Sequence, residues 1–280
     1  MEISFWKMHG AGNDFVLVDD RQRRFPLENQ EWIRRICDRH LGIGCEGILL
    51  IQPARSPDAH FRMRFINPDG SEVEMCGNGA RCIARLAYDL GIAPRKMCIE
   101  TRAGDVRAEV LDTGVEVELT PPRGWRMNQT IRTRKGRTVE YHFVDTGVPH
   151  AVVIVRGLSR VDVVGLGREI RWHSEFAPAG TNVDFVSVVD GELHVRTYER
   201  GVEAETPACG TGITAAALVA ARLGLVTSPV TVISAGGDRL KVSFKVSGES
   251  FSGVRLSGAA EYVFKGTVEL PAQQEKGDRH

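Results

Sequence analysis

Two cysteines in the 280-residue chain stand directly before a glycine-rich turn and an expected helix. Cys76 opens the sequence CGNGARC, and Cys209 opens CGTGITA. The first backbone N–H groups of a helix lack partners within the helix, and the helix dipole adds partial positive charge there. A thiol at that position is expected to have a lowered pKa, and the same N–H groups can bind a carboxylate. Each motif can therefore supply a base and an anion site in one place.

The two motifs also share the element that follows them. Aligning Cys76 with Cys209 aligns the glycines of both turns, and each apolar helical pattern closes at a glycine, Gly91 or Gly224. A thiol enzyme with a covalent intermediate needs one cysteine and a separate base. Two equivalent cysteines can instead face each other across one carbon atom. One thiolate would remove a proton and the opposite thiol would deliver one, which inverts a stereocentre.

The other four cysteines are interpreted as small buried apolar side chains: Cys37, Cys45, Cys82 and Cys98. Six cysteines without CxxC spacing argue against a disulfide scaffold and a zinc ribbon. We therefore expect neither a metal site nor a structural disulfide. Cys76 and Cys209 are expected to act through the reactivity of their thiols.

The segments around these helices are short, apolar and alternating, which is typical of strands in antiparallel pairs. One further helix is expected over residues 29–41. A second internal sequence similarity aligns residues 10–20 with residues 180–190. We therefore predict an α+β protein with two pseudo-symmetric domains, each a mixed, mostly antiparallel sheet or barrel curled around a central helix.

The boundary between the two halves is expected in residues 120–128, where proline and glycine coincide with a loss of pattern. This places the first domain at residues 1–120, with Cys76, and the second at residues 121–265, with Cys209. The last ten residues, 271–280, are polar and are expected to form a frayed tail.

The composition limits the classes of partner. Lysine plus arginine equals aspartate plus glutamate at 36 each, so no strong charge field attracts nucleic acid or anionic lipid. The N-terminal residues do not resemble a secretory signal, and the longest strongly apolar run, 213–221, is too short to cross a bilayer. The expected protein is cytoplasmic and acts on a small molecule, with neither nucleic acid nor membrane as a partner.

Five stretches of the chain then carry a family resemblance: MHGAGNDFV, DRHLGIG, NPDGSEVEMCGNGARC, GTNVDFV and RTYERGVEAETPACGTG. Together and in this order, they resemble the diaminopimelate epimerases over nearly the whole chain. The resemblance implies an isomerase without pyridoxal phosphate or metal that interconverts LL- and meso-diaminopimelate in lysine and peptidoglycan-precursor synthesis. It also implies an active site between two similar domains and a last strand, near residues 266–280, that returns to the first domain. A homodimer is a further expectation.

The resemblance assigns the reacting end of the substrate to two helix starts. Cys76 and Cys209 match the two catalytic bases. Glu199 matches a residue near the α-amino group. The residues that match the helix starts around the reacting carboxylate are Gly77, Asn78, Gly210 and Thr211.

The resemblance also implies a second set of residues, which grips chiefly the distal end of the substrate. This set is Asn13, Asn67, Asn182 and Arg200. His150 matches a histidine beside the site. A substrate with two amino acid ends needs such polar groups, and Arg200 is the natural bidentate partner of a distal carboxylate.

Two positions depart from the pattern of many family members. Gly47 stands where many have a side-chain amide, and Val148 stands where many have asparagine before the Pro149–His150 pair. Each departure removes one polar contact to the substrate. The cysteine pair is unaffected, so the departures bear on substrate identity rather than on reaction type.

Three alternatives stay open on the sequence. A proline or hydroxyproline racemase also uses two cysteines, although YERGVE and the asparagine set favour a substrate with a distal amino acid end. A thiol redox sensor would join Cys76 and Cys209 in a regulatory disulfide, which would also block catalysis because each sulfur must titrate. A metal-binding protein is the third alternative.

Overall fold

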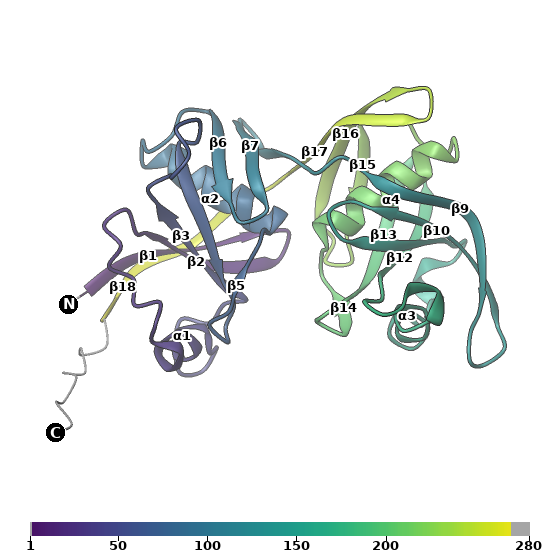
Figure 1. Cartoon of the computed structure of the whole chain (residues 1–280), viewed down its shortest axis with the longest axis horizontal. Coiled ribbons are helices and arrows are strands. Elements are labelled where there is room, and N and C mark those ends of the chain that lie inside the picture. Colours follow the sequence, from purple (N-terminus) through teal and green to yellow (C-terminus); the bar gives the residue numbers. More distant parts are fainter. Residues whose placement is uncertain (1, 270–280) are drawn as a thin grey trace.

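Two helices of 13 residues each, α2 (Gly77–Asp89) and α4 (Gly210–Arg222), lie at the centres of two strand-rich halves (Figure 1). The computed structural model describes residues 2–269 of the chain. Each helix ends on a leucine cap that is followed by a left-handed glycine, Gly91 with φ +68° and Gly224 with φ +73°. The predicted pair of equal helices with like C-termini is confirmed.

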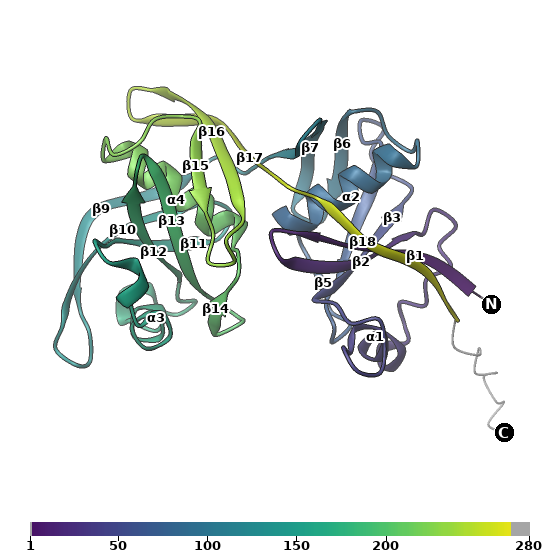
Figure 2. The same cartoon turned by 180° about the vertical axis from the view of Figure 1, so that it is seen from behind.

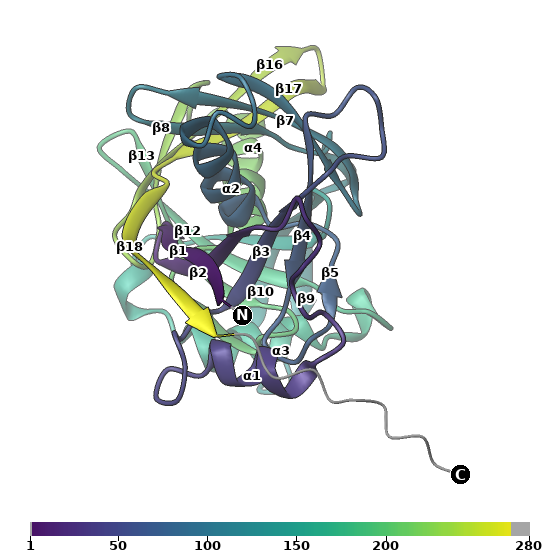
Figure 3. The same ribbon diagram turned by 90° about the vertical axis from the view of Figure 1, so that its left-hand side faces the viewer.

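The first half surrounds α2 with strands. In chain order they are β1 (Glu2–Gly10), β2 (Asn13–Asp19), β3 (Gly47–Gln52), β4 (Phe61–Ile66), β5 (Glu72–Val73), β6 (Lys96–Thr101), β7 (Gly104–Leu111) and β8 (Gly114–Glu118). β2 runs parallel to β3 and β4 runs parallel to β6, and the other pairings among these strands are antiparallel. Leu49 of β3 packs in the core around α2, and its neighbour Ile48 packs in the core of α1 (Gln30–Cys37). The two helices therefore cover opposite faces of this sheet (Figure 3).

The second half repeats this order of elements around α4. Its elements are β9 (Arg123–Arg132), β10 (Thr138–Asp145), β11 (Pro149–Ile154), η1 (Leu158–Arg160), α3 (Val163–Arg171), η2 (Ser174–Phe176), β12 (Asn182–Val189), β13 (Glu192–Glu199), β14 (Ala204–Thr206), β15 (Val230–Ile233), β16 (Arg239–Ser247) and β17 (Ser250–Gly258). The parallel pairs are β11 with β12, across α3, and β13 with β15, across α4. The first half has α1 and α2 in the corresponding places. The predicted α+β architecture with duplicated halves is confirmed.

The second predicted similarity, between residues 10–20 and residues 180–190, joins segments that occupy different places in the two halves. The first segment contains β2, whose counterpart in the sheet is β11, and the second contains β12, the counterpart of β3. That part of the prediction is wrong. The aligned glycines also differ in conformation, because Gly180 is left-handed with φ +68° whereas Gly10 lies within β1.

Two stretches of chain join the halves. β17 pairs with β16 in the second half and with β8 in the first, where Arg255 forms a 3.1 Å ion pair with Glu116. The chain then continues as β18 (Glu261–Glu269), which pairs antiparallel with β1 (Figure 2). This return strand begins at Glu261 rather than at residue 266, and residues 270–280 of the expected return and tail lie outside the described part.

Two helices differ from expectation. The helix expected over residues 29–41 ends at Cys37, because Asp38 is extended and the chain then folds back on the helix end. The sequence does not predict α3, whose pattern is interrupted by glycines. A Cβ on Gly167 would lie 2.5 Å from Cβ of Tyr198, so glycine allows α3 to pack closely against β13.

The boundary region 120–128 contains the first residues of β9, which begins at Arg123. The division into residues 1–120 and 121–265 stays a prediction. Within residues 2–269, none of the helices has the length and apolarity that a membrane crossing requires.

Candidate active site

The first turns of α2 and α4 lie against each other between the two halves. Cys76 is the N-cap of α2, and Cys209 is the N-cap of α4. A Cβ built on Gly210 would lie only 3.7 Å from Oδ1 of Asn78. The predicted site residues in these two turns are Cys76, Gly77, Asn78, Cys209, Gly210 and Thr211. The fold therefore directs the free N–H groups of two helices toward one region.

Cys76 is half-buried, and its sulfur lies among polar groups. The backbone N–H of Gly79 donates to the sulfur at 3.5 Å, and Oδ1 of Asn13 lies 3.7 Å from the sulfur. Asn78 donates to the same Asn13 oxygen at 3.4 Å, while Asn13 donates to Glu46. Asn13, at the start of β2, thus contacts the thiol and the helix start together. Sequence reasoning missed Glu46, for which the only signal was its place beside the unusual Gly47.

Cys209 is buried, with 8% of its surface exposed, and its sulfur lies 3.4 Å from Oγ1 of Thr211. Burial and the negative charges of Glu199 and Asp184 raise the pKa of the Cys209 thiol well above its usual value. Burial also raises the pKa of Cys76, and the Glu199 charge acts in the same direction. The expected lowering of both pKa values is wrong, because burial and nearby carboxylates outweigh the helix N-terminus.

Arg81 is a fully buried cation in the second turn of α2. Its Nη2 donates to Oδ1 of Asn78 at 3.0 Å, and its Nε donates to the Ala259 carbonyl at 3.4 Å. The Arg81 charge favours the Cys76 thiolate and so opposes part of the effect of burial on that pKa. Sequence reasoning missed this residue. Its position three residues after Asn78, on the same helix face, was the available signal.

A buried polar group in the second half lies beside the first turn of α4, where a Cβ on Gly212 would be 2.3 Å from Oδ1 of Asp184. His150 Nδ1 lies 2.7 Å from Asp184, neither side chain is exposed, and Thr197 donates to Asp184 at 2.7 Å. The other ring nitrogen of His150, Nε2, is buried and has no hydrogen-bond partner within residues 2–269. Glu199 accepts a 2.9 Å hydrogen bond from Thr206, and burial raises the pKa of the Glu199 carboxyl.

The remaining predicted residues divide into one connected pair and one separate residue. Asn182 accepts a 2.8 Å hydrogen bond from the Arg200 backbone and donates to the Pro149 carbonyl at 3.0 Å. The Arg200 guanidinium forms no ion pair with any residue in the range 2–269. Asn67 is held in the turn after β4, where its side chain donates to Ser71 at 3.0 Å. Among the described residues, the Asn67 side chain has no hydrogen bond to another predicted site residue.

The two departures from the family pattern have different surroundings. A Cβ on Gly47 would lie 2.2 Å from Cε2 of Phe65, so the aromatic ring occupies the space that a longer side chain would need. Phe65 is half-buried and packs edge-on against Phe15, with ring centroids 5.8 Å apart. Val148 lies in the loop between β10 and β11, where its carbonyl accepts a 3.1 Å hydrogen bond from Thr146. Sequence reasoning missed Phe65, which reads as an ordinary strand residue.

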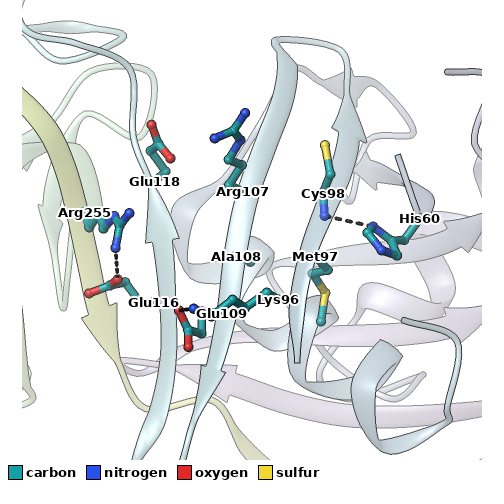
Figure 4. Close-up of a pocket in the computed structure, with 10 residues that line it drawn as sticks. All are labelled: His60, Lys96, Met97, Cys98, Arg107, Ala108, Glu109, Glu116, Glu118 and Arg255. Atoms are coloured by element: carbon teal, nitrogen blue, oxygen red, sulfur yellow. Dashed lines mark hydrogen bonds and ion pairs between the residues drawn. The ribbon is translucent and has the colours of Figure 1, made fainter. Parts of the chain in front are cut away.

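A groove of about 340 Å³ on the outer face of β6, β7, β8 and β17 includes none of the predicted site residues (Figure 4). Its charged residues pair across neighbouring strands, with Lys96 3.5 Å from Glu109 and Arg255 3.1 Å from Glu116. Such pairs are typical of a solvated sheet surface. No cluster of three or more His, Cys, Asp or Glu that could hold a metal ion occurs in the stretch 2–269.

Comparison with known proteins places the chain in a sequence family. The family model described as diaminopimelate epimerase matches residues 5–125 and 142–263. The diaminopimelate epimerase of Aquifex aeolicus is 44% identical over 277 residues, which cover 95% of this chain and 98% of that protein. The protein of the same name from Archaeoglobus fulgidus is 40% identical over 283 residues, covering 96% and 98% of the two chains.

Solved structures share the fold at low sequence identity. A phenazine biosynthesis protein of the PhzF family from Bacillus anthracis has a TM-score of 0.74 at 16% identity, covering 96% of this chain and all of that one. A hydroxyproline epimerase from Agrobacterium vitis, with bound trans-4-hydroxy-L-proline, has a TM-score of 0.69 at 19% identity, covering 95% and 92%. These similarities establish the fold alone.

Proposed function

The chain belongs to the diaminopimelate epimerase family and is an isomerase, and we propose that it interconverts LL- and meso-diaminopimelate with Cys76 and Cys209 as the two bases. The observation that carries this proposal is the contact between the first turns of α2 and α4, each capped by one of these cysteines. The reaction belongs to lysine and peptidoglycan-precursor synthesis and takes place in the cytoplasm.

The proton balance of the reaction needs one thiolate and one thiol. The thiolate takes the α-proton, which leaves the electron pair on the α-carbon and in the adjacent carboxylate. The opposite thiol then delivers its proton to the other face of the carbon, and the roles of the sulfurs are exchanged. Cys76 is the better candidate for the thiolate, because Arg81 and the N–H groups of Asn78 and Gly79 lower its pKa against burial.

The substrate itself favours formation of the thiolate. The carboxylate of Glu199 raises the pKa of both thiols. A substrate ammonium group bound beside Glu199 offsets that negative charge and so lowers the thiol pKa values. Meanwhile the N–H groups of Gly77, Asn78, Gly210 and Thr211 stabilise the carboxylate as carbanion charge spreads into it. A cysteine thiol therefore loses its proton chiefly when a substrate with an α-ammonium group is bound.

The distal end of diaminopimelate is a second ammonium–carboxylate pair. The guanidinium of Arg200, which has no ion-pair partner in the described residues, is suited to the distal carboxylate. The side-chain amides of Asn13, Asn67 and Asn182 supply neutral hydrogen bonds, and Nε2 of His150 is a buried polar atom with no hydrogen-bond partner among residues 2–269. At position 47 the chain has glycine, and the Phe65 ring lies in the space that a side chain there would need.

The proposal includes two features of the assembly. The domains are residues 1–120 and 121–265, with the final strand returned to the first domain. The protein forms a homodimer through β18, where Tyr262, Val263 and Phe264 are 42%, 55% and 47% exposed. Sedimentation of the purified protein tests the dimer: a dimer that dissociates when Phe264 is replaced by aspartate supports it, and a monomer contradicts it.

The activity is tested by solvent exchange. Purified protein is incubated in deuterated water with LL-diaminopimelate or with L-proline, and deuterium at the α-carbon is measured by mass spectrometry. We expect exchange and inversion with diaminopimelate. Exchange into proline alone would indicate a racemase of the proline type, and a lack of exchange with either substrate by the reduced protein would favour a thiol sensor.

A further inference from the structure

Cys37 and Cys45 form a second pair of cysteines, far from the reaction pair in the fold. Their sulfur atoms are 3.4 Å apart, and the side chains are 6% and 5% exposed. Both lie in the core between the first sheet and α1, whereas Cys76 packs against the core of α2 on the opposite face. The sequence alone indicates only packing residues at these positions. The reaction described above uses neither thiol.

The fold brings the pair together through the return of the chain after α1. The helix ends at Cys37, and Gly42 packs so closely on its end that a Cβ there would lie 1.9 Å from the Arg35 carbonyl oxygen. Gly44 takes φ +75° and donates to the Ile36 carbonyl at 3.0 Å. Cys45 then donates its backbone N–H to the Cys37 carbonyl at 3.0 Å.

That backbone hydrogen bond sets a spacing suited to a disulfide. Disulfides need Cα atoms about 4.4–6.8 Å apart, and the N–H···O=C bond from Cys45 to Cys37 holds the two residues directly beside each other. The sulfurs are already in contact. Bond formation requires the two sulfurs to close from 3.4 Å to the S–S bond length of about 2.05 Å.

A buried cation lies beside the pair. Lys7 is 6% exposed, its Nζ donates to the Gly44 carbonyl, and it forms a 2.6 Å ion pair with Asp14. A hydrogen bond with Cys37 and the Lys7 charge lower the pKa of the Cys45 thiol, and the same contact raises the pKa of Cys37. Cys45 is therefore the sulfur that reacts first with an electrophile.

We propose that Cys37 and Cys45 are an oxidisable dithiol, which a peroxide converts to a disulfide that fastens the segment between them. The Cys45 thiolate attacks one peroxide oxygen, the O–O bond breaks, and a sulfenic acid and hydroxide form. The Cys37 thiol then attacks the sulfenic sulfur, the S–S bond forms and water leaves. In total, two thiols and one hydrogen peroxide give one disulfide and two waters.

The disulfide restrains a segment that serves the active site. Cys45 precedes Glu46, whose side chain accepts a hydrogen bond from Asn13 and whose backbone N–H donates to the Asp14 carboxylate at 3.1 Å. Arg39, within the closed loop, pairs with Asp14 at 3.1 Å. Closing this loop removes freedom from the unfolded chain, so the oxidised protein is more stable.

The test uses full-length Cys76→Ala protein, in which the reaction pair cannot link. After treatment with hydrogen peroxide and alkylation of free thiols, trypsin separates residues 36–39 from residues 40–55, because it cleaves after Arg35, Arg39 and Arg55. We expect these two peptides to be joined by a bond that dithiothreitol breaks. We also expect Tm to rise by about 5 °C on oxidation.

Two further variants in the same background give the controls. Adding Cys37→Ala should abolish both the joined peptide and the rise in Tm, whereas adding Cys98→Ala should leave both unchanged. The joined peptide is measured in the Cys76→Ala protein, which retains Cys37. The test therefore does not depend on how well the Cys37→Ala variant folds. Oxidation of Cys45 or Cys98 without the joined peptide, or a joined peptide without a rise in Tm, would overturn the proposal.

Discussion

Asn78 and Gly210 lie in contact distance across the two halves, with Oδ1 of Asn78 3.7 Å from the place of a Gly210 Cβ. Asn78 belongs to the first turn of α2, and Gly210 begins α4. Each helix alone offers a common type of anion site. Their contact turns two separate sites into one, in which a carboxylate can receive N–H groups from both halves of a duplicated chain.

The first prediction concerns the glycines of these turns. A Cβ on Gly212 would lie 2.3 Å from Oδ1 of Asp184, which His150 and Thr197 hold in place. Gly212→Ala should therefore lower the free energy of unfolding by about 1–3 kcal/mol, measured in urea. Gly77→Ala is the control, because nothing lies within 4 Å of its Cβ position, and its stability should change by less than about 0.5 kcal/mol. Equal stabilities for the two variants would contradict this description of the packing.

The second prediction concerns the contact between Gly47 and Phe65. Gly47→Ala places a Cβ 2.2 Å from the Phe65 ring and should destabilise the protein by about 1–3 kcal/mol. In the double variant with Phe65→Leu, the smaller side chain gives the new methyl group room. Urea unfolding of the two single variants and the double variant should yield a coupling of about 0.5 kcal/mol or more. Strictly additive effects would show that the ring does not fill the space at position 47.

The third prediction concerns the charge of Glu199. Thiolates react with iodoacetamide and thiols do not, so alkylation of Cys76 and Cys209 should increase with pH and reach its limit only above the usual cysteine pKa. Glu199→Gln removes a negative charge that raises both pKa values. The alkylation curves of both cysteines should therefore shift to lower pH, as followed by peptide mass spectrometry.

The control for this charge effect is Glu205→Gln. The Glu205 charge is neutralised by its ion pair with Arg196 at 2.7 Å, so the curves should stay in place. An unchanged curve for Glu199→Gln, or a shift to higher pH, would contradict the account of how the carboxylate acts.

Sequence reasoning recovered the parts of the molecule that depend on local pattern. The helices after Cys76 and Cys209 were predictable because apolar period, N-terminal glycines and closing glycine agree in both copies. Helix α3 was not predictable, because Gly167 weakens its helical pattern and exists for a contact with Tyr198 that only the fold reveals.

The site residues divide in the same way. Residues within a motif, such as Asn78 and Gly210, could be predicted from the sequence. The contacts of Arg81 with Ala259, and of Gly47 with Phe65, join residues from different elements and follow only from the tertiary structure. The direction of the thiol pKa shifts was missed for the same reason, since burial and the Glu199 charge depend on the assembled cleft.

Cys76 and Cys209 each carry one proton of the proposed reaction, and single replacements of these residues test this. LL-diaminopimelate is incubated with Cys76→Ala, Cys209→Ala and the control Cys98→Ala, and the meso product is quantified by chiral chromatography. Each of the first two variants should fold but lose turnover by about 100-fold or more, while the control stays active. Turnover near that of the unchanged protein in either Cys76→Ala or Cys209→Ala would contradict these proton-transfer roles.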